Sequence, residues 1–186
     1  MENRNYDSGF VGDAADVSGD GGASQAMANA VKRIGLISDT HGLLRKEAVD
    51  ALRGSEMIIH AGDVGKPEIL EELRKIAPVI AVRGNVDTEA WARALPETAV
   101  AEAGVALIYI LHDVKALDLN PAAAGFRVVV SGHSHKSGKT ERDGVLYINP
   151  GSAGPRRFQL PVTVARLMLE EKPWNVEFVG LEVRGK

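Results

Sequence analysis

Apolar and polar positions follow a repeated pattern from residue 33 onward. Short apolar runs, rich in β-branched residues, each end in a polar cluster that contains Gly, Asp or Asn, as buried strands of an α/β sheet do. Five runs share this pattern, at residues 33–38, 56–60, 79–83, 105–111 and 127–131. Each is therefore predicted to be a strand that ends in polar residues.

Two segments between the early strands have helical spacing. They span residues 46–54 and 66–77, and the second carries Pro67 near its first turn and Ile69, Leu73 and Ile76 on one face. Strand, helix and strand in alternation predict βαβ units. The first half of the chain is therefore predicted to be α/β.

The pattern changes in the second half. Residues 140–148 place Asp143-Gly144 between two extended runs, which indicates a two-residue hairpin. Residues 160–170 and 174–183 alternate as long antiparallel strands do. We therefore expect this half to be mostly β.

Residues 1–30 differ from the rest of the chain. They show no sustained helical or strand period, contain the run GDGGAS, and hold five acids against one base, a formal charge of −4. We interpret them as a disordered tail or an added leader, with Met27 as a plausible start. Residues 31–186 then form one domain.

Composition restricts the classes of protein that remain. Of the 186 residues, 45% are apolar, and there is no cysteine, so any metal must be held by nitrogen and oxygen ligands. No apolar run approaches a membrane span and no secretory signal is evident, so we expect a soluble, cytoplasmic protein. The net charge of −3 leaves residues 31–186 at +1, which argues against a nucleic-acid polymer as main partner.

Candidate metal ligands follow the predicted strands. Four of the five histidines lie beside Asp, Asn or Gly at strand ends, and imidazole, carboxylate and amide groups bind first-row divalent ions. Seven ligands are too many for one catalytic ion with an open position but suit two ions that share a carboxylate. The candidates are Asp39, His41, Asp63, Asn85, His112, His133 and His135.

Each candidate also has a simpler interpretation. Asp39 and Asn85 could cap strand-to-helix turns, His112 could be an ordinary polar residue at a strand end, and the two late histidines could lie in a surface turn. The whole set favours a metal site over seven separate explanations. His60 lies within a strand and is interpreted as a hydrogen-bonded core histidine.

The ordered motifs resemble those of the calcineurin-like metallophosphoesterases. They are DTH at 39–41, GD at 62–63, GNVD at 84–87, the strand-terminal His112 and GHSH at 132–135. NPGS at 149–152 and the short chain resemble the small YfcE-type phosphodiesterase branch. The resemblance covers nearly all of the chain beyond residue 33.

This resemblance implies an α/β fold of four layers, two mixed β-sheets packed face to face with helices outside. It also implies that one ion takes Asp39, His41, Asp63 and His135, and the other Asp63, Asn85, His112 and His133. Two ions, Mn²⁺ in our expectation with Fe, Ni, Co or Zn as alternatives, would hold a hydroxide that attacks phosphorus in line. No side-chain nucleophile is needed, and Asp63, Asn85 and His133 are the predicted catalytic residues through the hydroxide they help to hold.

Two positions depart from the family pattern. Val86 stands where many larger relatives have a histidine thought to protonate the leaving group, so we expect phosphodiesters with good leaving groups as substrates. Asp113 follows His112 where relatives often have Gly, and Pro121 makes the following segment poorly suited to a long helix.

Two further residues are predicted to support the site. Asp87 is expected to orient a ligand or cap the next helix rather than bind metal. Arg156 could clamp a substrate phosphate, and a solvent-facing basic loop is an equal alternative.

Two other classes of protein were weighed. An amidohydrolase-type metal enzyme also uses a His-x-His pair, but this chain is short for its ~250-residue barrel. A non-catalytic, metal-binding scaffold for protein interaction, like the retromer subunit of the same superfamily, stays open. The substrate is expected to be a small phosphoester, and its identity, the native metal and the oligomeric state are left open.

Overall fold

The computed structural model describes residues 31–157, 159–170 and 172–182. The predicted tail at residues 1–30 lies outside the described residues. Among the described helices, none is long and apolar enough to cross a bilayer.

The first sheet has five strands in the order β10-β9-β1-β2-β3. Its three early strands are parallel, β9 pairs antiparallel with β1, and β10 pairs antiparallel with β9, so the sheet is mixed. The strands are β1 (Arg33–Ile37), β2 (Met57–His60), β3 (Val79–Ala81), β9 (Thr163–Met168) and β10 (Asn175–Gly180).

The second sheet also has five strands, in the order β4-β5-β6-β8-β7. Its three central strands are parallel and both edges are antiparallel. The strands are β4 (Thr98–Ala103), β5 (Ala106–Leu111), β6 (Val128–Val130), β7 (Gly138–Arg142) and β8 (Val145–Asn149). Asp143 and Gly144, both at positive φ, form the predicted hairpin turn between β7 and β8.

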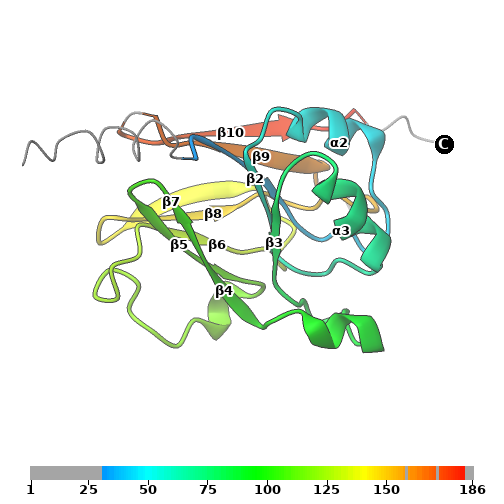
Figure 1. The fold of residues 1–186 in the computed structure, drawn as a ribbon, viewed down its shortest axis with the longest axis horizontal. Coiled ribbons are helices and arrows are strands. Elements are labelled where there is room, and N and C mark those ends of the chain that lie inside the picture. Colours follow the sequence, from blue (N-terminus) through cyan, green and yellow to red (C-terminus); the bar gives the residue numbers. More distant parts are fainter. Residues whose placement is uncertain (1–30, 158, 171, 183–186) are drawn as a thin grey trace, which may run out of the picture.

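The sheets pack face to face as two layers (Figure 1). Residues such as Leu36, Ile59, Ile108 and Val130 fill the core between them and are fully buried. Helices α2 (Lys46–Leu52) and α3 (Pro67–Arg74) cover the other face of the first sheet through a second core. The predicted α/β sandwich of two mixed sheets is confirmed.

The outer face of the second sheet is covered differently. Residues 113–126 pack there over Tyr109, with Phe126 against its ring and one short 3-10 helix, η2 (Val114–Ala116). Proline at 121 lacks the N–H that a continuing helix needs, as the sequence indicated. The fourth layer is therefore mainly an irregular segment of turns rather than an α-helix.

Three elements were not predicted from the sequence: the 3-10 helix η2 of the covering segment, strand β4 and the 3-10 helix η1 (Ala90–Ala94). Strand β4 reads TAVAEA, and η1 is a short helix. Alanine and glutamate have low intrinsic preference for strands, so β4 forms because it pairs with the strongly apolar β5 and buries Ala101 and Ala103.

Candidate metal centre

The polar clusters follow parallel strands of both sheets, and their side chains gather in one place. β1, β2 and β3 lead to the Asp39–His41, Asp63 and Asn85 loops, while β5 and β6 lead to His112 and the loop of His133 and His135. Parallel strands end at the same edge of a sheet, which is where open α/β sheets commonly bind ligands. The fold therefore brings together side chains that are nearly 100 residues apart.

One half of the cluster contains Asp39, His41 and His135. Asp39 Oδ1 lies 3.2 Å from His135 Nε2 and 4.0 Å from His41 Nε2. The Nε2 atoms of His41 and His135 are 3.4 Å apart. These three residues present ligand atoms within 4.8 Å of one another and could hold a metal ion.

The other half is joined to the first through Asp63. Its Oδ2 lies 3.9 Å from His41 Nε2 and 3.4 Å from His112 Nε2. Asn85 Oδ1 then lies 3.1 Å from His112 Nε2 and 3.0 Å from His133 Nδ1. All seven predicted ligands therefore belong to one continuous cluster, with Asp63 between its halves.

The two buried carboxylates are fixed in the same way. Asp39 Oδ2 accepts a hydrogen bond from the His133 amide at 3.2 Å, and Asp63 Oδ1 accepts one from the Val86 amide at 2.9 Å. The other oxygen of each faces the imidazole nitrogens. Asp39 Oδ1 is buried and accepts no hydrogen bond from any described residue. Carboxylate oxygens that face imidazole nitrogens fit a divalent cation, which would also offset the cost of burying the unpaired Asp39 Oδ1.

The backbone of the cluster is held in an unusual conformation. Six described residues other than glycine have positive φ, and five of them are predicted ligands: Asp39, His41, Asp63, His133 and His135, with φ from 47° to 66°. The left-handed region costs an L-residue about 1–2 kcal/mol. Strain of this kind concentrates at functional sites, and here it aims alternate side chains of each loop inward.

Two glycines allow the ligand loops to approach one another. A Cβ on Gly132 would lie 1.9 Å from Ser38 Oγ and 2.8 Å from Asp39 Oδ2. A Cβ on Gly84 would lie 2.1 Å from both the amide nitrogen and Oδ1 of Asp63. Any larger residue at either position would displace an aspartate of the cluster.

Burial is the largest single influence on the pKa values of the cluster residues. It raises the pKa of Asp39 to about 6 and lowers the pKa of His41 and His135, and the positive charge of Arg157 lowers the pKa of both histidines further. For His112 burial acts downward, but bonding to Asp63 and to the Ala61 carbonyl outweighs it, so the pKa is raised. Neutral His41 and His135 are in the form that binds a cation.

His60 is buried and hydrogen-bonded, as the sequence predicted. Its Nε2 lies 2.9 Å from Thr40 Oγ1, whose own proton goes to the Val64 carbonyl, so Nε2 must be the donor. Nδ1 is then a bare nitrogen with no partner among the described residues. Burial lowers the pKa of His60 to about 3, and the residue stays neutral.

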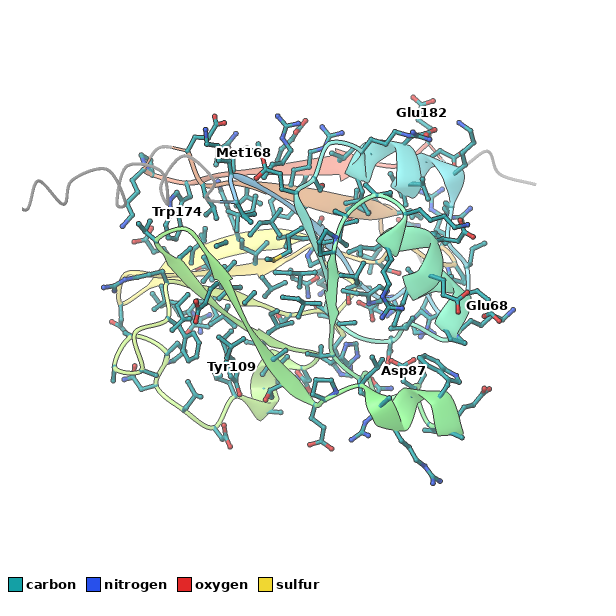
Figure 2. The ribbon with its side chains drawn as sticks, viewed as in Figure 1. Glu68, Asp87, Tyr109, Met168, Trp174 and Glu182 are labelled. Carbon is teal, nitrogen blue, oxygen red and sulfur yellow. The ribbon has the colours of Figure 1, made fainter. Side chains whose placement is uncertain are left out.

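Asp87 ties two ligand loops together. Its Oδ2 accepts from the amides of Gly84 and Val64 at 2.9 and 3.1 Å, and its Oδ1 accepts from the Gly65 amide at 2.8 Å. The residue is only 3% exposed and lies near η1, on the opposite side of the molecule from Trp174 (Figure 2). Asp87 therefore positions the loops of Asp63 and Asn85.

The segment after β8 supports the first ligand loop. Ser152 Oγ donates to the Asp39 carbonyl at 3.0 Å, and Gly154 N to the same carbonyl at 3.2 Å. Arg45 holds this segment in turn through the Gly154 carbonyl. No sequence pattern indicates the contacts of Ser152 and Arg45.

Of the two neighbouring arginines, Arg157 is electrostatically coupled to the cluster. Its charge lowers the pKa of His41 and His135, although both arginines are exposed and neither side chain makes a hydrogen bond or ion pair within the described residues. The sequence offers both arginines as a phosphate clamp and does not distinguish Arg157 from the predicted Arg156, because neighbouring arginines look equivalent in a sequence. The substrate role of Arg156 stays a prediction.

Asp113 also approaches the cluster. Its Oδ2 lies 3.7 Å from His133 Nε2, and its Oδ1 accepts from the Lys115 amide at 3.0 Å. The carboxylate thus faces the imidazole nitrogen that points away from Asn85.

Comparison with known proteins agrees with this geometry. Residues 33–172 match the model of the calcineurin-like phosphoesterase superfamily domain. A probable metallophosphoesterase of Methanothermobacter thermautotrophicus is 33% identical over 147 residues, which are 72% of this chain and 85% of that protein.

Solved structures show the same fold. A novel archaeal phosphodiesterase is 26% identical with a TM-score of 0.67, covering 79% of this chain and 99% of its own. Vps29 of Chaetomium thermophilum, 19% identical, covers 80% and 97% with a TM-score of 0.65, and shows the fold alone. With the family model matching most of the chain, the protein belongs to the calcineurin-like phosphoesterase superfamily, as its ordered motifs predicted.

Proposed function

We propose that the chain is a dinuclear metal-dependent phosphodiesterase that acts on small phosphodiesters with good leaving groups. The observation that carries this proposal is the arrangement of Asp39 and Asp63. Each has one carboxylate oxygen fixed by a backbone amide and the other facing imidazole nitrogens. Two cations sharing Asp63 account for all seven side chains of the cluster.

The proposed division of ligands follows the two halves of the cluster. One ion would be held by Asp39, His41, Asp63 and His135, and the other by Asp63, Asn85, His112 and His133. When bound, two such ions supply a water activated near neutral pH and neutralise charge on the phosphoryl oxygens. We propose Mn²⁺ as the native metal and the cytoplasm as the location of the protein.

The chain's own residues orient this chemistry. The amides of His133 and Val86 fix the two carboxylates, and Asp87 holds the loop that carries Asn85. Arg157, whose charge acts on His41 and His135, would attract the substrate phosphate.

The preference for good leaving groups comes from the histidines. Of the five in the chain, four belong to the cluster and His60 is buried with a pKa of about 3. No imidazole remains to protonate a leaving group, and Val86 at the expected position is 41% exposed. Alkyl esters, whose leaving groups need a proton, should react far more slowly than aryl esters.

A non-catalytic scaffold is the second candidate. The superfamily fold is shared with Vps29, and three exposed apolar side chains lie within two residues of predicted ligands: Leu43, Val86 and Val114. Such a rim could contact a protein partner. It could equally contact an aryl ester.

The test combines metal analysis with turnover. Purified protein loaded with Mn²⁺ is assayed on bis(p-nitrophenyl) phosphate, p-nitrophenyl phosphate and an alkyl p-nitrophenyl diester, beside Asp63→Asn. We expect the native protein to bind two ions and to hydrolyse the diesters. In Asp63→Asn we expect neither ion to be fully occupied and turnover to be lost. No turnover with two ions bound would select the scaffold, and faster monoester hydrolysis would overturn the diester preference.

A further inference from the structure

A basic groove adjoins the metal cluster. It is a cavity of about 330 Å³ between β7, the ends of β6 and β8, and the start of residues 113–126. Of the covering segment, only Val114 lines this cavity. The groove follows β7 for four residues, about 14 Å at the usual rise of a strand.

The lining of the groove is cationic. Lys136, Lys139 and Arg142 line it, and none of the acidic residues that the structure describes does. Arg142 lies over the ring of Tyr147 at 5.6 Å from its centroid, which limits the freedom of both side chains. Lys139 also lines a neighbouring cavity beside Trp174 together with Glu141, and Arg142 also lines a cavity with Asp118 and Asp143. Three bases without a neutralising acid in the lining favour an anionic ligand.

The groove is continuous with the cluster through two side chains. Ser134, between the two late histidines, and Asn149, at the end of β8, both line it. Asn149 Nδ2 donates to the Gly132 carbonyl at 2.6 Å and to Ser134 Oγ at 3.0 Å, which fixes the border between groove and cluster. A substrate held at the cluster can therefore extend one arm along β7.

We propose that this groove binds a second phosphate, carried on one arm of the substrate. The substrate class is then a phosphodiester of nucleotide size with an additional anionic group, rather than a simple neutral-armed diester. The inference rests on the proposed function for its placement of the reacting phosphate. Binding of the second phosphate requires the positive charges of Lys139 and Arg142. A binding measurement can therefore test the inference without any turnover of substrate.

The test is equilibrium binding by calorimetry to the Mn²⁺-loaded full chain. Thymidine 3′,5′-bisphosphate is compared with thymidine 5′-monophosphate, and fructose 1,6-bisphosphate with fructose 6-phosphate. We expect each bisphosphate to bind about tenfold more tightly than its monophosphate, as one added charge-assisted contact provides. A gain for the nucleotide alone would show that the ring is also recognised.

The variants separate the groove from general surface charge. Lys139→Gln combined with Arg142→Gln should reduce the tenfold preference to below threefold, while Arg142→Lys should retain most of it. Arg74→Gln, an exposed base on α3, should retain all of it. Equal binding of mono- and bisphosphates by the wild type, or an unchanged preference in the double variant, would overturn the inference.

The two proposals fail in different ways. Hydrolysis of bis(p-nitrophenyl) phosphate without a bisphosphate preference would support the phosphodiesterase proposal and refute the proposed second phosphate site. A bisphosphate preference without hydrolysis of any diester would support the groove as a ligand site and refute the proposed phosphodiesterase activity.

Discussion

Asp87→Asn tests how far one buried carboxylate holds the ligand loops together. The native carboxylate accepts three backbone hydrogen bonds, from Gly84, Val64 and Gly65, at 2.8 to 3.1 Å. An asparagine keeps one oxygen. In its better orientation that oxygen serves Gly84 and Val64, and the side-chain NH₂ then opposes the Gly65 amide.

The magnitude follows from these contacts. A hydrogen bond to a charged group is worth about 1.5–3 kcal/mol, and the variant loses one such bond and the charge from the other two. We expect Asp87→Asn to lower the free energy of unfolding by about 3 kcal/mol. Asp87→Ala, which loses all three acceptors, should lower it by more than 4 kcal/mol.

Urea denaturation of the metal-free protein measures this loss, with an unchanged m-value as a check on two-state unfolding. Calorimetry with Mn²⁺ should show metal affinity about 10–100-fold weaker, because the loop of Asn85 is no longer held. Asp118→Asn, at an exposed aspartate on residues 113–126, is the matched control and should change neither quantity. A loss below 1 kcal/mol in Asp87→Asn would refute the reasoning.

Three further predictions follow from the site. Gly132→Ala should lower the free energy of unfolding by about 2–3 kcal/mol through the clash with Ser38 and Asp39, and an unchanged urea midpoint would contradict the close approach. The pKa of His60, about 3 in the fold against 6.5 when exposed, means that the unfolded chain binds more protons as pH falls below 6.5. Metal-free protein should therefore lose about 3 kcal/mol of stability by about pH 4.5 through this group. His60→Gln can still donate to Thr40 but should not show this pH-dependent loss of stability. An identical pH profile of stability in both proteins would refute the role of His60. Removal of metal by a chelator should abolish diester hydrolysis and lower the melting temperature, and added Mn²⁺ should restore both; activity that survives in demonstrably metal-free protein would refute a metal-dependent enzyme.

The predictable part of the fold was the part with strong apolar periodicity. The strands before Asp39, Asp63, His112 and His133 are β-branched and buried, so both their extent and their polar ends could be recognised. Strand β4 could not, because its alanines and glutamate gain strand structure only from pairing with β5.

The site likewise has a part that can be predicted from the sequence and a part that cannot. Residue types and their positions at strand ends are sufficient to identify the seven clustered side chains. The contacts of Asp87, Ser152 and Arg45 depend on which backbone groups the folded loops bring within reach, and Arg157 differs from Arg156 only in its position relative to the cluster. A linear sequence does not contain that information.

The left-handed backbone at five cluster residues has a thermodynamic consequence for how this protein can change. Each such histidine or aspartate is a worse choice for the empty fold than glycine, by about 1 kcal/mol. A His133→Gly protein should thus resist urea better than its parent while binding Mn²⁺ poorly. Selection for conformational stability alone would replace these residues by glycine. The chain therefore has a lower free energy of unfolding than the fold allows, and in return it can bind metal ions.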